Sequence, residues 1–166
     1  MPLNEEETIK KLLEQTAHGA DSLRVMGEGF TRFYNRLELI AKQHRRRMPV
    51  RDDGFQDDMR SAVGQLRALA DDAQDSWQAA RACYYAADRA AFVREHRVLI
   101  KQLKAAAAAL RRRADEIYDA YKNLSALGAD LPLRPNWWVF ESSANDLLKT
   151  AASIFALTRD MERYYE

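Results

Sequence analysis

The residues of this sequence that could do chemistry do not form the common metal-binding or nucleophilic patterns. A di-iron helical bundle needs a glutamate three positions before each ligating histidine, and the residues at that spacing from His18, His44 and His96 are glutamine, alanine and valine. Cys83 is the single cysteine, whereas a zinc site needs several thiolate or imidazole ligands. A glycine-rich phosphate loop and a Gly-x-Ser-x-Gly turn do not occur either. We therefore expect no metal, no cofactor and none of the common enzyme reactions.

One pair of residues nevertheless has a spacing associated with RNA cleavage. Arg89 and His96 are separated by six residues, which resembles the Arg-x4–6-His signature of the HEPN family of ribonucleases. The resemblance covers these two positions, and the position after the arginine, often polar in the family, is Ala90 here. It implies a helical bundle in which Arg89 and His96 cleave RNA, usually across a dimer interface. The alternative is that His96, which lies on an apolar stripe, is a core or helix-end histidine.

The densest basic cluster of the sequence is His44 followed by the arginines Arg45, Arg46, Arg47 and Arg51. Cations at the C-terminal end of a helix complement the helix dipole, and the aspartates that follow nearly neutralise this cluster. The alternative is that the four arginines bind an anion or a lipid headgroup. These arginines and the long amphipathic helices are the support in the sequence for peripheral contact with a membrane surface.

Aromatic residues occur as adjacent pairs at four places in the chain. These pairs are Phe33-Tyr34, Tyr84-Tyr85, Trp137-Trp138 and Tyr164-Tyr165. Neighbouring side chains of a helix point about 100° apart, so both rings of a pair do not lie at the centre of one buried stripe. The outer ring either caps the core or belongs to a second contact surface, because tyrosine and tryptophan are enriched where proteins meet. We take Tyr85, Trp137, Trp138 and Tyr165 as candidate partner contacts.

The positions of helix breakers predict the elements that carry these residues. Prolines and turn-forming glycines gather at residues 2, 49–54 and 128–135, and neither type occurs between Gly64 and Gly128. Apolar residues recur in alternating steps of three and four, as in coiled coils, and there is no period-two alternation. We predict an all-α single domain over residues 1–166, an elongated antiparallel up-down four-helix bundle. Its helices are expected over about 4–47, 53–87, 90–127 and 137–165. Gly19, Gly27 and Gly29 inside the first helix predict close packing or a gentle kink, with a hinge as the alternative.

The long run without breakers must still reverse its direction. Its apolar stripe reaches Ala87 and resumes nine residues later at His96, which would place the second stripe on the opposite face of a straight helix. A turn at about residues 88–91, with Asp88 as the N-cap of the next helix, resolves this conflict.

The charges on the two sides of the proposed turn have opposite signs. Residues 52–75 contain seven aspartates and two arginines, whereas residues 88–113 contain eight lysines or arginines and two acids. Antiparallel pairing is therefore expected to bring opposite charges together. The pairing predicted on this basis places Asp71, Asp72 and Asp75 alongside Lys101, Lys104 and the start of the arginine run at Arg111.

Composition limits the partners and the compartment. The 26 lysines and arginines nearly balance the 25 aspartates and glutamates, so no global charge attracts nucleic acid or anionic lipid. No apolar run reaches the roughly 20 residues that span a bilayer. The lone Cys83 has no intramolecular disulfide partner, and the N-terminal residues are acidic, unlike a signal peptide. We predict a cytoplasmic protein.

These features favour a self-associating, non-enzymatic helical interaction module that serves as an adaptor, chaperone-like or structural subunit. Its expected partner is a protein, either a second copy of this chain or another helical protein. The alternatives are a helical bundle that binds a membrane surface and a HEPN-like ribonuclease.

Overall fold

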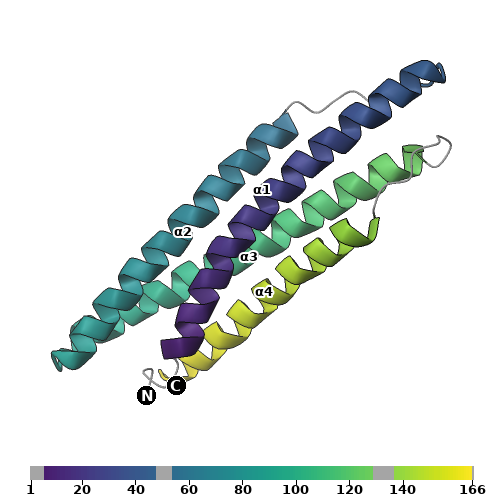
Figure 1. The fold of residues 1–166 in the computed structure, drawn as a ribbon. Coiled ribbons are helices and arrows are strands. Elements are labelled where there is room, and N and C mark those ends of the chain that lie inside the picture. The colour runs from purple at the N-terminus through teal and green to yellow at the C-terminus, as the bar shows by residue number, and fades with distance from the viewer. Residues whose placement is uncertain (1–5, 48–53, 129–136, 166) are drawn as a thin grey trace.

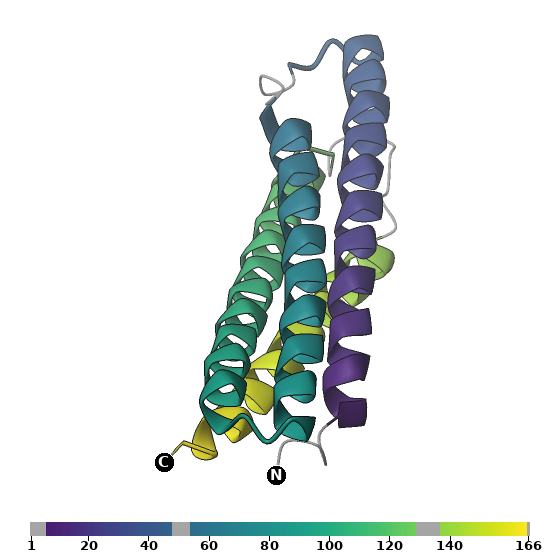
Figure 2. The same ribbon diagram turned by 90° about the vertical axis from the view of Figure 1, so that its left-hand side faces the viewer.

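The computed structural model describes residues 6–47, 54–128 and 137–165, and these residues form four long helices. The helices are α1 (Glu6–Gln43), α2 (Gly54–Tyr85), α3 (Arg89–Gly128) and α4 (Trp137–Arg163). They run up, down, up and down in an elongated antiparallel bundle (Figure 1). The beginning of α1, the turn between α2 and α3, and the end of α4 lie at one end of this bundle (Figures 1 and 2). The predicted all-α four-helix bundle is confirmed.

The core consists of one buried stripe from each helix. Leu23 of α1, Leu66 of α2, Leu110 of α3 and Ile154 of α4 are all fully buried in it. Each helix thus satisfies its own backbone hydrogen bonds and contributes an apolar face to a shared interior. Helix α3 has extensive contacts with both α2 and α4, so it links the two sides of the bundle.

Helix α1 ends at Gln43, four residues earlier than the sequence predicts. The N–H of Arg46 donates to the carbonyl of Ala41 at 2.8 Å, and the N–H of Arg45 donates to that of Lys42 at 3.2 Å. This pair of bonds is the Schellman pattern, in which the residue past the helix is left-handed. Arg45 has that conformation, with φ of 54°. Arginine is not a typical residue there, which explains why the sequence did not predict the end of this helix.

The turn between α2 and α3 is built in the same way. Ala87 has φ of 58°, and the N–H of Asp88 donates to the carbonyl of Cys83 at 3.0 Å. The Asp88 carboxylate then accepts the N–H of Ala91 at 3.1 Å, which caps α3. The predicted reversal and the predicted N-cap are therefore both confirmed. The turn lies slightly earlier than the predicted residues 88–91, because α2 ends at Tyr85 and α3 begins at Arg89.

The predicted charge pairing between α2 and α3 is wrong. Among the described residues, no ion pair joins these two helices. Asp71 instead faces α1 across a cavity, and Lys104 is paired with Glu162 of α4. The charged stripes of α2 and α3 point away from the seam between them, because that seam is filled by apolar side chains.

Gly19 marks a close contact between α1 and the helices α3 and α4. A Cβ atom at this position would lie 2.9 Å from Cδ2 of Leu110 and 3.5 Å from Cδ2 of Leu147. The same test at Gly64 of α2 finds no atom within 4 Å. Close packing, which was predicted for the α1 glycines beside a gentle kink or a hinge, is thus observed at Gly19.

We expect these two glycines to respond oppositely to alanine. Gly64→Ala should stabilise the fold by about 0.5–1 kcal/mol, because alanine is the better helix former and meets no obstacle. Gly19→Ala gains the same helix propensity but must displace the buried Leu110, so we expect a net loss of about 1 kcal/mol. Urea unfolding of both variants measures the difference. Equal stabilisation by the two substitutions would show that α1 does not pack as described.

The turn between α2 and α3 makes a second prediction. Asp88→Ala removes the cap of α3 and should lower the free energy of unfolding by about 1 kcal/mol. Ala87→Gly should raise it by several tenths of a kcal/mol or more, because glycine adopts positive φ without strain. Thermal unfolding monitored by circular dichroism tests both variants. A loss of stability in Ala87→Gly would contradict the left-handed conformation at residue 87.

Candidate interaction surface

Aromatic side chains from three helices meet at the end of the bundle where α2 turns into α3. We call this group the aromatic cluster. It contains Tyr84, Tyr85, Phe92, His96, Tyr164 and Tyr165. Phe92 is its centre, because its ring lies 5.9 Å from that of Tyr84, 5.2 Å from that of His96 and 6.2 Å from that of Tyr164. The cluster exists because the turn at residues 86–88 places the end of α2 beside the start of α3, next to the end of α4 (Figure 2).

The cluster has a buried inner layer and an exposed outer layer. Phe92 is 4% exposed and His96 is fully buried, whereas Tyr85 is 65% exposed and Tyr164 is 43% exposed. Among the large apolar side chains of the described residues, Tyr85 has the greatest exposure. Large rings held at the surface on a rigid aromatic base are the side chains that most often dominate the energy of a protein interface.

His96 and Tyr165 join α3 to the end of α4 within this cluster. The Nδ1 atom of His96 and the hydroxyl oxygen of Tyr165 are 2.5 Å apart, and the tautomer of the ring decides which of them donates. Nε2 is buried and has no hydrogen-bond partner among the described residues. Burial lowers the pKa of His96 from 6.5 to about 4, so the ring is neutral at physiological pH. Burial also raises the pKa of the Tyr165 hydroxyl, although the nearby Arg97 opposes this shift.

Two arginines lie over the outer rings. The guanidinium carbon of Arg97 is 4.8 Å from the centre of the Tyr165 ring, and that of Arg81 is 5.8 Å from the centre of the Tyr85 ring. Both distances are within the range of a cation–π interaction. Arg81 also forms an ion pair with Glu6 at 3.1 Å, so the beginning of α1 supports the same surface.

Two of the four predicted partner contacts fall in the aromatic cluster. Tyr85 is the most exposed ring of the cluster. Tyr165 is half-buried, and its hydroxyl lies within hydrogen-bonding distance of Nδ1 of His96. Trp137 and Trp138 begin α4 at the opposite end of the bundle (Figure 1), and their side chains lie outside the described residues. Tyr84, Phe92 and Tyr164 were not predicted from the sequence as partner contacts. The Tyr84-Tyr85 and Tyr164-Tyr165 pairs were the available signal, but only the fold brings the two pairs together.

The two residues with ribonuclease-like spacing lie in different environments. Arg89 is the first residue of α3 and is exposed, whereas His96 is fully buried beneath the aromatic cluster. In this structure the imidazole of His96 faces Phe92 and the two C-terminal tyrosines. The ring therefore does not open to solvent, where a polynucleotide would approach.

The predicted anion-binding arginines lie just past the end of α1. Arg45, Arg46 and Arg47 are exposed, and they form no ion pair with a described residue. Arg51 lies outside the described residues. These three exposed side chains give the arginine cluster room to contact an anion.

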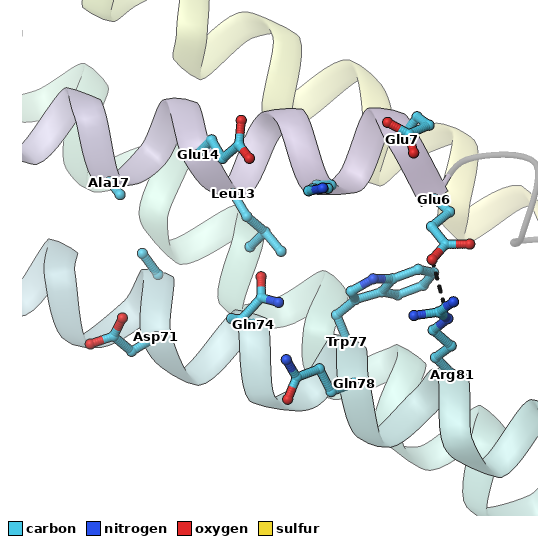
Figure 3. A pocket seen from close by; sticks show the side chains of 12 residues that line it. Glu6, Glu7, Leu13, Glu14, Ala17, Asp71, Gln74, Trp77, Gln78 and Arg81 are labelled. Atoms are coloured by element: carbon cyan, nitrogen blue, oxygen red, sulfur yellow. Dashed lines mark ion pairs between the residues drawn. The ribbon is translucent and has the colours of Figure 1, made fainter.

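A cavity of 450 Å³ lies between α1 and α2 (Figure 3). Its floor includes Leu13 and Trp77, and its rim includes four carboxylate side chains, of Glu6, Glu7, Glu14 and Asp71, against the cations Lys10 and Arg81. The Glu6–Arg81 ion pair spans one end of the cavity (Figure 3). This side of the bundle therefore presents an apolar hollow with an acidic rim.

The described residues contain no group of three or more histidine, cysteine or acidic side chains that could hold a metal ion. No helix among these residues has both the length and the apolar character needed to cross a membrane. Comparison of the chain with protein-family models, curated proteins and solved structures finds no significant match. The function must therefore be argued from the surfaces of this chain.

The buried His96 makes stability depend on pH. Its folded-state pKa of about 4 lies below the ordinary value of 6.5, so between these values the unfolded chain binds the extra proton. The contribution of His96 is complete above pH 6.5 and decreases as the pH falls toward 4, by an amount on the order of 3 kcal/mol. Urea unfolding at pH 7.5 and pH 4.5 measures this loss.

His96→Leu should show a smaller loss of stability between these pH values than the wild type. The comparison between proteins is needed because carboxylates titrate in the same range. His18→Leu is the matched control, since the side chain of His18 is exposed, and it should behave as the wild type. An identical pH dependence in His96→Leu and the wild type would contradict the burial of a neutral imidazole.

Proposed function

We propose that this protein is a non-enzymatic helical interaction module that self-associates through the aromatic cluster. The observation that carries this proposal is the exposure of Tyr84, Tyr85 and Tyr164 at one end of a rigid bundle. Inside the molecule these outer rings contact mainly one another and the Phe92–His96 base. A partner that covers them would therefore bury aromatic area without having to order a flexible segment first.

The chemistry of the cluster supports a second copy as the partner. In a two-fold symmetric dimer the same patch meets itself, so the patch must be complementary to itself. The aromatic cluster presents exposed tyrosine rings, and the neighbouring Arg81 and Arg97 stack on two of its tyrosines. Edge-to-face tyrosine pairs and arginine–tyrosine pairs can then form in both directions across the two-fold axis.

The other two functions have less support in the described residues. A HEPN-like ribonuclease would need the imidazole of His96 at an accessible interface, whereas here it lies in the interior. Membrane-surface binding rests on the exposed side chains of Arg45, Arg46 and Arg47. Leu39 is the one exposed large apolar side chain near them in the sequence among the described residues. We propose further that the module works in the cytoplasm, since Cys83 is its one thiol.

Sedimentation velocity over roughly 1–100 µM, a range that spans typical weak self-association, tests the proposal. We expect the wild-type mass to rise above that of a monomer with concentration. Tyr85→Ser should weaken self-association at least about tenfold, as expected for an exposed aromatic residue at the centre of an interface. Tyr118→Ser is the matched control, because Tyr118 is a 36%-exposed tyrosine of α3 outside the cluster.

The control variant should associate as the wild type does. A strict monomer over the whole concentration range would overturn the proposed self-association. An equal effect of Tyr85→Ser and Tyr118→Ser on self-association would show that the interface does not lie at the aromatic cluster.

A further inference from the structure

A second surface lies on the side of the bundle formed by α3 and α4. We call it the α3–α4 groove. It contains a cavity of 680 Å³ lined by both helices, including Lys104, Arg111, Leu148, Ala152, Phe155 and Arg159. A smaller cavity of 370 Å³ adjoins the first, since Lys104 lines both of them, and it continues along α3 to Arg97. The two cavities follow one another along the seam of α3 and α4 and together form an open groove, and the two helices lie side by side (Figure 1).

The rim of the groove is strongly cationic. It contains Arg97, Lys101, Lys104 and Arg111 of α3 and Arg159 of α4. The only acidic side chain that lines either cavity is Glu162, which is paired with Lys104. The other four cations form no ion pair with a described residue. This local positive charge is not apparent from the net charge of the whole chain, which is +1.

The cations of α3 follow a helical period. Residues 97, 101, 104 and 111 are separated by steps of four, three and seven, so they form one stripe along the helix. At 1.5 Å per residue this stripe is about 21 Å long. Carboxylates on a partner helix that repeat with the same period would face the stripe along its whole length.

The floor of the groove is apolar and recessed. Leu148 and Phe155 supply the large side chains, and Ala151 and Ala152 between them leave room for a helix to approach. The phosphates of a nucleic acid would contact the cationic rim but leave the aliphatic part of the floor, Leu148 and the two alanines, uncovered. A small ligand is held in a cavity that encloses most of its surface, whereas this groove is open along its length.

We propose that the α3–α4 groove binds an acidic amphipathic helix of a partner protein. The apolar face of that helix covers Leu148 and Phe155, and its carboxylates face Lys101, Arg111 and Arg159. This is the helix-in-groove mode of recognition. The hollow between α1 and α2 has an apolar floor but an acidic rim, so the same helix is repelled there, and charge directs it to one side of the bundle.

Fluorescence anisotropy with labelled peptides of about 18 residues, long enough to fill the groove at 1.5 Å per residue, tests this proposal. The probe is an acidic amphipathic peptide with leucines on one face and glutamates on both flanks. The two comparison peptides are a scramble of the same composition and a version with lysine in place of glutamate. We expect the acidic amphipathic peptide alone to bind, and its affinity to fall as salt is raised.

Substitutions in the groove then locate the site. Ala152→Glu adds a carboxylate to the groove at an exposed position, and it should weaken binding of the acidic peptide at least about tenfold. Arg111→Glu combined with Arg159→Glu should have the same effect. Ala68→Glu is the matched control, because Ala68 is an exposed alanine of α2 that lines no described cavity, and it should bind as the wild type does.

Several outcomes would overturn the proposal. These are no binding of the acidic peptide, equal binding of its scramble, or equal losses in Ala152→Glu and Ala68→Glu. Tighter binding of a single-stranded RNA of similar length than of the peptide would assign the groove to nucleic acid instead. Tyr85→Ser should leave peptide binding unchanged, because Tyr85 lines neither cavity of the groove.

Discussion

The rest of this structure depends on a turn of three residues in a stretch that contains neither glycine nor proline. Ala87 adopts a left-handed conformation, and the carboxylate of Asp88 caps the first turn of α3. These two local features convert what would be one long rod into two antiparallel helices of similar length. A left-handed alanine costs about 1–2 kcal/mol, so the apolar contacts of α2 with α3 must exceed that cost.

The same turn creates both surfaces to which we assign functions. It places Tyr84 and Tyr85 beside Phe92, where the end of α4 adds two more tyrosines. It also fixes the rotation of α3, so that apolar side chains fill the seam with α2 and the cations line the opposite side next to α4. The protein thus combines an aromatic end with a basic groove, while its net charge stays near zero.

The sequence predicted the fold well because helix periodicity and breaker positions are local signals. It predicted the reversal at residue 88 because the apolar stripe changes face there, a consequence of helix geometry alone. It did not predict the end of α1, since Arg45 is an unusual left-handed residue. The sequence also led to the wrong prediction that the charges of α2 and α3 pair across one seam. The net charge of a segment does not specify which face of the helix carries the charged side chains. The aromatic cluster joins residues as far apart in the sequence as His96 and Tyr165, which are separated by 69 positions, and only tertiary packing brings such residues together.

The most direct test of this account is the distance across the turn between α2 and α3. Pulsed electron paramagnetic resonance can measure the distance between spin labels at Gln65 and Ala108 in a Cys83→Ala background. Both positions are exposed, and they are roughly equidistant from Ala87 in the sequence. Antiparallel packing of α2 on α3 predicts a separation below about 25 Å, because packed helix axes lie 8–10 Å apart and the labels add their own length. A separation of about 65 Å, as expected for one unbroken helix, would contradict it.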